Sequence, residues 1–124
     1  MIGGIQDIYY STSNPKLAIK FYTEALGMKL KSENEYWIVL DCCGVTVGLH
    51  PEPKSIPRIP RDSHGALAGA TLTLKSNNIP DDRKHLESHG AIILGEADQP
   101  WGHILVFEDP DGNVLKLMHP KHGH

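Results

Sequence analysis

The spacing of apolar residues along the chain predicts short strands interrupted by two amphipathic helices. After Asn14-Pro15, which suit the start of a helix, apolar residues recur at helical spacing until Gly27 ends the pattern. Around this helix, alternating and β-prone runs predict strands. The first half is therefore expected to contain a strand, a helix and three more strands, over residues 5–12, 15–26, 28–32, 36–40 and 45–50, with a turn at 41–44.

The second half repeats this order. Asn77, Asn78 and Pro80 open a second predicted helix, which runs to about His89 and ends at Gly90. Strands are predicted over 70–75, 91–94, 103–108 and 114–118. The repeat pairs Asp7 with Thr71, Gly27 with Gly90, Gly44 with Gly112, and Gly48 with Lys116.

A proline-rich stretch lies between the two halves. Four prolines between positions 51 and 63 make regular structure improbable there. The pattern predicts a single α+β domain over residues 1–124, with a first module at 1–52, a linker at 53–68 and a second module at 69–124.

Composition and charge narrow the classes of partner. The 124 residues carry a formal charge of −3, which gives no electrostatic reason to expect nucleic acid as a partner. No apolar run approaches the roughly 20 residues of a membrane span, and the N-terminus does not resemble a secretory signal, so a cytoplasmic protein is expected. Cys42 and Cys43 are adjacent and are expected to be free thiols.

Two motifs point to a known family. Asn14-Pro15 leading to Phe21-Tyr22 and Leu26-Gly27 resembles the FY…LG signature of the vicinal oxygen chelate superfamily, the glyoxalase, bleomycin resistance and extradiol dioxygenase proteins. Trp101-Gly102, a strand and residues 109–113 resemble its second signature, WG…DPDGN. The resemblance implies two tandem βαβββ modules with curved mixed sheets forming a cleft, and a homodimer that binds a small molecule.

The resemblance also implies four positions at which the family's enzymes hold a divalent metal. They fall on Asp7, Gly48, Thr71 and Lys116. Only Asp7 is a good ligand, because glycine offers no side chain, threonine is a weak donor and lysine adds a positive charge. His50, two residues beyond Gly48, could join Asp7 and His103 in an unorthodox metal site.

Three functions follow as alternatives. The preferred one is a metal-independent small-molecule binding protein, with no cofactor, whose cleft is lined by nine residues: Asp7, Tyr9, Trp37, Gly48, His50, Thr71, Trp101, His103 and Lys116. The second is a divalent-metal-dependent lyase, isomerase or dioxygenase of the same superfamily. The third is a metal-free enzyme in which Asp7 is the base and Lys116 stabilises an oxyanion, the two residues otherwise forming an ion pair across the cleft.

Overall fold

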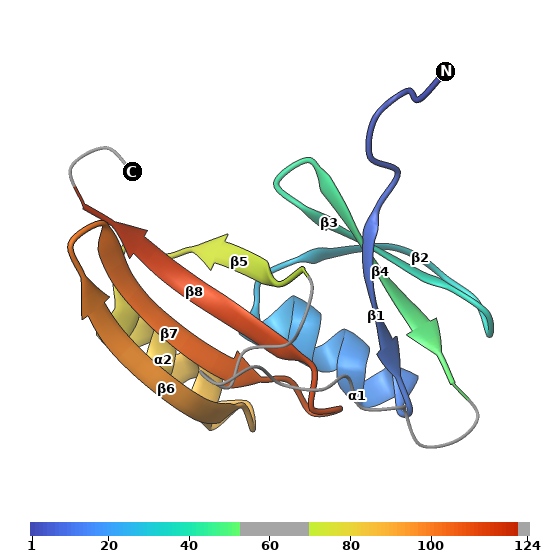
Figure 1. The fold of residues 1–124 in the computed structure, drawn as a ribbon. Helices are drawn as coiled ribbons and strands as arrows, with labels where there is room; N and C mark the ends of the chain where they lie inside the picture. The colour runs from blue at the N-terminus through green and yellow to red at the C-terminus, as the bar shows by residue number, and fades with distance from the viewer. Residues whose placement is uncertain (53–69, 122–124) are drawn as a thin grey trace. The chain divides into compact units, whose positions relative to one another are not determined.

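The computed structural model describes residues 1–52 and 70–121, which belong to two compact units with the same order of elements (Figure 1). The first unit contains β1 (Ile8–Thr12), α1 (Pro15–Lys20), η1 (Phe21–Ala25), β2 (Lys29–Glu33), β3 (Ile38–Cys42) and β4 (Val45–Pro51). The second contains β5 (Leu72–Lys75), α2 (Ile79–Ser88), β6 (Ile92–Gln99), β7 (Gly102–Glu108) and β8 (Val114–Pro120). The predicted α+β class and the repeated βαβββ order are confirmed.

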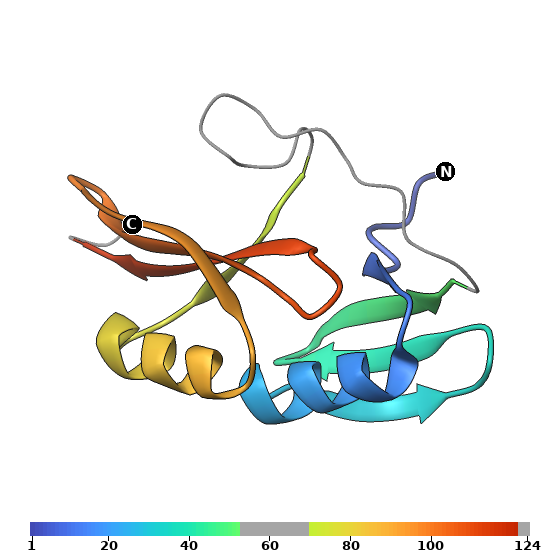
Figure 2. The same cartoon turned by 90° about the horizontal axis from the view of Figure 1, so that it is seen from below.

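Each unit is a four-stranded mixed sheet with one face covered by a helix (Figure 2). The strand orders are β1-β4-β3-β2 and β5-β8-β7-β6. The first strand of each unit runs parallel to the last, and the other pairs are antiparallel. A parallel pair needs a crossover connection, and the helix of each unit lies in that connection.

The first helix begins and ends where its sequence predicts. The side chain of Asn14 accepts a hydrogen bond from the backbone N–H of Leu17 (3.2 Å), and Pro15 lies in the first turn. The last turn, η1, widens to a π-helix in which the N–H of Leu26 donates to the carbonyl of Phe21 (3.1 Å). Gly27 then has φ +73°, a conformation that glycine adopts without strain.

The helix-covered face of each sheet forms the core of that unit. In the first unit, Phe21 and Tyr22 are buried together with strand residues from β3 and β4: Ile38, Leu40, Val47 and Leu49. In the second unit, Ile79 and Leu86 of α2 are buried, as are Leu105, Phe107, Leu115 and Leu117 of β7 and β8. Since side chains alternate along a strand, the remaining positions of β4, β7 and β8 point to the opposite face of each sheet, here called the open face.

The strand ends differ from the prediction in two instructive places. The strand predicted at 91–94 extends to Gln99 because β6 pairs along the whole of β7, with an irregularity between Ile93 and Gly95. His119, one residue beyond the strand predicted at 114–118, lies within β8 opposite His103. The predicted linker at 53–68 lies outside the described residues.

The hairpin between β3 and β4 turns on only two residues. Cys42 pairs with Val45, and the two residues between them, Cys43 and Gly44, have φ values of +50° and +93°. Positive φ at both central positions is typical of a type I′ turn, whose twist matches that of the strands it joins. The predicted four-residue turn is therefore shorter, and Cys43 occupies a position that usually favours Asn or Gly.

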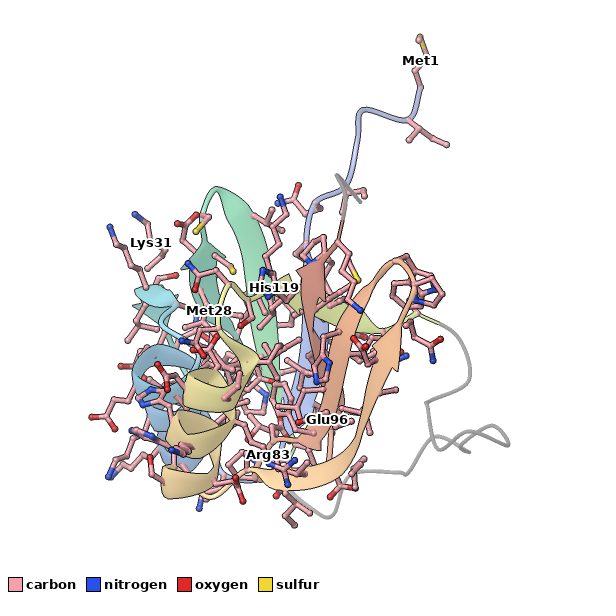
Figure 3. The ribbon with its side chains drawn as sticks, turned by 90° about the vertical axis from the view of Figure 1, so that its left-hand side faces the viewer. Met1, Met28, Lys31, Arg83, Glu96 and His119 are labelled. Carbon is pink, nitrogen blue, oxygen red and sulfur yellow. The ribbon has the colours of Figure 1, made fainter. Side chains whose placement is uncertain are left out.

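The N-terminal segment extends away from β1, and Met1 at its end is fully exposed (Figure 3). No helix in the two described stretches is long and apolar enough to cross a membrane.

Candidate functional site

Three aromatic rings gather on the open face of the first sheet. Tyr9 of β1 lies edge to face with Trp37, with ring centroids 5.4 Å apart. The imidazole of His50 on β4 is 6.3 Å from the Tyr9 ring and 6.2 Å from the Trp37 ring. We call Tyr9, Trp37 and His50 the aromatic group. Because Tyr9 is 56% exposed, the group presents ring surface to solvent.

Gly48 makes this arrangement possible. The strand register places Gly48 between Tyr9 on β1 and Val39 on β3, on the same open face. A Cβ atom at Gly48 would lie 2.3 Å from Cζ2 of Trp37 and 2.7 Å from Cη2. The indole therefore rests directly on the backbone of β4, at a distance that only glycine permits.

The backbone that precedes β3 holds Trp37 in place. The side chain of Asn34 accepts hydrogen bonds from the backbone N–H groups of Tyr36 (2.8 Å) and Trp37 (2.9 Å). The N–H of Asn34 in turn donates to the carbonyl of Trp37 (3.0 Å). These three bonds close a tight turn, so the position of Trp37 is set locally and not by the core alone.

A polar border adjoins the aromatic group. Nδ1 of His50 lies 3.0 Å from a carboxylate oxygen of Glu52, and both side chains are partly exposed. Asp7 directly precedes β1, two residues before Tyr9. The first unit thus brings together four of the predicted site residues, namely Tyr9, Trp37, Gly48 and His50.

The open face of the second sheet carries a cation instead of aromatic rings. Lys116 of β8 is paired with Thr73 on β5 and with Val106 on β7. The second unit therefore places Thr73 and Lys116 at paired positions on one face, with Thr71 just before β5.

His103 lies on the other face of that sheet. It is three residues from Val106 along β7, an odd number, so its side chain points to the face that α2 covers. The structure thus separates His103 from Lys116, two residues that were expected to line one cleft. Trp101, 41% exposed, belongs to the turn before β7, where its carbonyl accepts from the N–H of Lys121 (3.0 Å).

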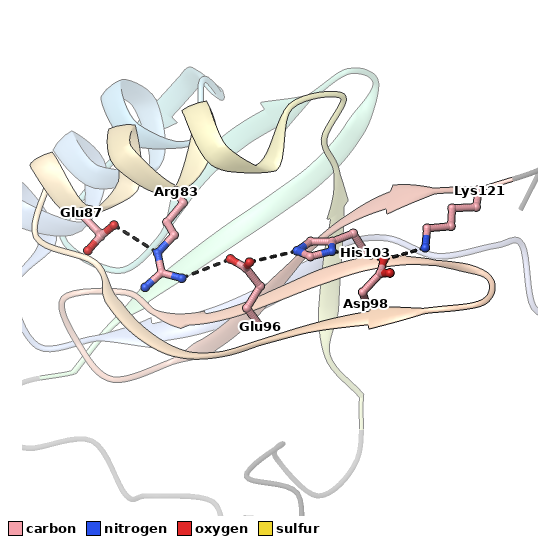
Figure 4. Close-up of polar contacts among 6 residues, drawn as sticks. All are labelled: Arg83, Glu87, Glu96, Asp98, His103 and Lys121. Atoms are coloured by element: carbon pink, nitrogen blue, oxygen red, sulfur yellow. Dashed lines mark hydrogen bonds and ion pairs between the residues drawn. The ribbon is translucent and has the colours of Figure 1, made fainter.

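His103 belongs to a chain of charged side chains that links α2, β6 and β7 (Figure 4). Nε2 of His103 lies 3.0 Å from Glu96, and Nδ1 lies 3.4 Å from Asp98. Glu96 also binds Arg83 of α2 at 3.1 Å (Figure 3). The ends of the chain are Glu87, 3.3 Å from Arg83, and Lys121, 2.6 Å from Asp98.

The contacts among these charged side chains raise the pKa of the histidine and lower the pKa values of the carboxylates. The hydrogen bond to Glu96 raises the pKa of His103, and the same bond lowers the pKa of Glu96. The Lys121 ammonium, followed by His103, lowers the pKa of Asp98. These side chains are between 31% and 63% exposed, so the ion pairs are screened by solvent and their number is a weak argument for stability. Glu96 and Asp98 were not predicted, because the strand was expected to end at Leu94.

The DPDGN motif is explained by its own hydrogen bonds. Asp109, 2% exposed, accepts from the backbone N–H groups of Asp111 and Asn113 (2.9 Å each) and from Nδ2 of Asn113 (3.0 Å). The N–H of Asp109 donates to the carbonyl of Asn113 (2.9 Å), and Gly112 has φ +84°. The motif therefore builds the connection between β7 and β8 and offers no evidence of catalysis.

The residues at the family's metal positions do not match its set of ligands. The space above Gly48, where a carboxylate would project, is filled by the Trp37 indole. On the second sheet, the corresponding position holds the ammonium of Lys116, which repels a cation. Within residues 1–52 and 70–121, no group of three or more His, Cys, Asp or Glu side chains is placed to hold a metal ion.

Comparison with known proteins gives one family. The model of the Glyoxalase/Bleomycin resistance protein/Dioxygenase superfamily matches residues 4–117. The metallothiol transferase FosB of Staphylococcus haemolyticus is 30% identical over 119 residues, which cover 94% of this chain and 84% of that protein.

Solved structures agree on the fold. The fosfomycin resistance protein FosX of Listeria monocytogenes has a TM-score of 0.77 at 11% identity, covering 98% of this chain and 97% of that one. TnmS3, an antibiotic binding protein from Streptomyces sp. CB03234, has a TM-score of 0.65 at 23% identity, covering 98% and 100%.

Proposed function

The chain belongs to the Glyoxalase/Bleomycin resistance protein/Dioxygenase superfamily, and from this premise we propose that it binds a small planar organic molecule on the aromatic group of the first sheet. The observation that carries the proposal is the seat of Trp37 on Gly48. This seat fixes one indole on the open face of the sheet, next to Tyr9 and His50. Rings held in a fixed position lose little conformational freedom when a flat ligand stacks on them.

The polar side chains beside the aromatic group suggest which functional groups the ligand has in addition to a ring. The imidazole of His50, paired with Glu52, offers a hydrogen-bond donor beside the ring surface. Asp7 adds a carboxylate that would favour a cationic or hydroxyl group. Lys116 lies on the second sheet, paired with Thr73, and its predicted role toward a ligand stays a prediction. The expected ion pair between Asp7 and Lys116 joins the two units and stays a prediction.

A direct test uses anthraquinone-2-sulfonate, a planar aromatic anion, as the probe. Binding next to Trp37 should quench its fluorescence in a saturable way. Replacing Trp37 by Leu should weaken binding by at least about tenfold, since a stacking contact on an aromatic side chain contributes roughly 1–3 kcal/mol. The matched control is Trp101→Phe, which removes the other indole. Equal affinity of the Trp37→Leu, Tyr9→Ala and wild-type proteins would contradict the proposal.

A second candidate is a divalent-metal-dependent thiol transferase, and the relatives favour it over metal-free binding. FosB, named a metallothiol transferase, matches almost the whole chain, and FosX of Listeria monocytogenes has been solved with Mn(II). Asp7 and His50 are the residues of the first unit that could hold such an ion. Against this candidate stand the indole over Gly48 and the ammonium of Lys116.

Metal analysis of the untagged protein separates the two candidates. The metal-free proposal expects unchanged binding of the anthraquinone probe in EDTA, and no loss of bound metal when Asp7 is replaced by Asn. One manganese or zinc ion per chain that is lost in Asp7→Asn would establish the second candidate. Transfer of a thiol such as cysteine to fosfomycin would then be the assay to run.

A further inference from the structure

Two histidines lie side by side at the end of α2, and neither belongs to the aromatic group or to the chain of charged side chains. His85 and His89 are four residues apart, and their ring centroids are 4.4 Å apart. Positions i and i+4 lie on the same side of a helix, which explains the proximity. His85 is exposed and His89 partly exposed, so both rings can be reached from solvent.

The hydrogen bonds of His89 fix which ring nitrogen keeps its lone pair. Nδ1 of His89 lies 2.9 Å from the backbone carbonyl of His85, which can only accept, and 3.1 Å from the hydroxyl of Ser88, which donates its proton to the same carbonyl. The proton of the neutral ring is therefore on Nδ1, and Nε2 carries a free lone pair. Histidine ligands of metals have this arrangement, with one nitrogen donating to a carbonyl and the other bound to the ion.

From this geometry we propose that His85 and His89 form a surface site for a borderline transition-metal ion such as Cu²⁺, Ni²⁺ or Zn²⁺. Two nitrogens bound to one tetrahedral ion at about 2.0–2.1 Å lie about 3.3 Å apart. Rings whose centres are 4.4 Å apart can present one nitrogen each at such a separation. Water completes the coordination, and imidazole nitrogens select these ions over Mg²⁺ or Ca²⁺.

The site is independent of the proposed function. It lies on α2, which covers the face of the second sheet opposite to Lys116, and it uses no residue of the aromatic group. A structural role also exists for these side chains, because His89 and Ser88 both donate to the carbonyl of His85 and so satisfy one of the last carbonyls of the helix. The experiment must distinguish this capping from metal binding.

The variant that separates the two roles is His85→Gln. His85 contributes only its backbone carbonyl to the cap, so the variant keeps the cap and removes one imidazole. His89→Gln removes one imidazole and also the hydrogen bond that its ring donates to the cap. All proteins are untagged full chains in which His122 and His124 are replaced by Gln, so that these two imidazoles do not compete, and His119→Gln is the matched control.

Titration with Cu²⁺, Ni²⁺ and Zn²⁺ at about pH 7.5 is followed by calorimetry, and the Cu²⁺ complex by electron paramagnetic resonance. The parent should bind one ion with two nitrogen ligands, most tightly for Cu²⁺. Loss of even an outer-shell partner typically costs about 10–100-fold in metal affinity, so His85→Gln should lose at least about tenfold. Without metal, its melting temperature should fall less than that of His89→Gln, because it keeps the cap.

Three results would overturn the site. The first is no binding of Cu²⁺ by the parent at millimolar concentration. The second is equal affinity in the parent and in His85→Gln. A metal that is lost in Asp7→Asn but not in His85→Gln would belong to the second candidate function and would leave the present site without its ion, which also counts against it.

Discussion

Replacing Gly48 by Ala tests the contact on which the candidate site depends. The added methyl carbon would lie 2.3 Å from Cζ2 of Trp37, far inside van der Waals contact, while Ile38, Leu40 and Leu49 keep the strands fixed from the other face. The indole must therefore leave its seat. The cost combines overpacking with loss of the edge-to-face contact to Tyr9, and we expect about 1–2 kcal/mol of destabilisation.

Thermal and urea denaturation measure this loss. At the size of this chain, a change of that magnitude lowers the melting temperature by about 4–8 °C. Fluorescence, recorded in a Trp101→Phe background, should show Trp37 moving into a more polar environment. The matched control is Gly95→Ala on β6, where an added Cβ meets nothing within 4 Å. That variant should be neutral or slightly more stable.

A double-mutant cycle of Gly48→Ala and Trp37→Ala measures whether the two positions are coupled. With Trp37 replaced by Ala, the clash disappears, and Gly48→Ala should become neutral or stabilising, a coupling of about 1 kcal/mol or more. If Gly48→Ala lowers the free energy of unfolding equally with and without the indole, contact with Trp37 is not the reason that position 48 requires glycine. Wild-type stability and unchanged fluorescence of the single variant would refute the seat of Trp37 outright.

Three further predictions concern the turns and the charged chain. Cys43→Asn should raise the free energy of unfolding by about 0.5–1 kcal/mol in urea denaturation, because Asn tolerates the positive φ of the type I′ turn. Asp109→Ala should lower it by about 2–4 kcal/mol, with Asp109→Asn between, since the buried carboxylate holds three N–H donors. The raised pKa of His103 means that its pairing stabilises the fold fully below about pH 6.5 and is lost as pH rises through the folded-state value. The unfolding free energy of His103→Gln should therefore fall less than that of the wild type from pH 6 to pH 9, and an equal fall would exclude a role for this pair.

The fold was predictable because its signals are local. Asn14 and Asn78 cap helices through their own side chains, and Gly27 and Gly90 end them at positive φ, so each feature depends on a few neighbouring residues. The end of β6 was not predictable, since Gly95 to Gln99 join the sheet only through pairing with β7. Residues 96–99 are mostly polar and have no strand pattern of their own, so they become a strand only as the hairpin partner of β7.

The site was predictable in part. Counting two residues along β1 and β4 places Tyr9, Gly48 and His50 on one face, and the register agrees with that placement. The same rule of alternation places His103 opposite to Lys116 once the core face of β7 is known, and that choice depends on which residues α2 covers. The indole on Gly48 could not be read from the sequence, because a glycine in a strand does not say which neighbour approaches it.

The DPDGN segment bears on how such proteins diverge. Asp109 accepts hydrogen bonds from backbone N–H groups of the loop that it lies in, Asn14 caps the helix that follows it, and Gly27 takes a positive φ at the end of that helix. The motif residues by which the family is recognised therefore stabilise loops and helix ends of the fold. The predicted site positions Gly48 and Lys116 lie on strands β4 and β8, outside those motifs. In this chain, the motif residues identify the family, whereas residues on the strand faces are predicted to determine the activity. The two sets of residues are separate.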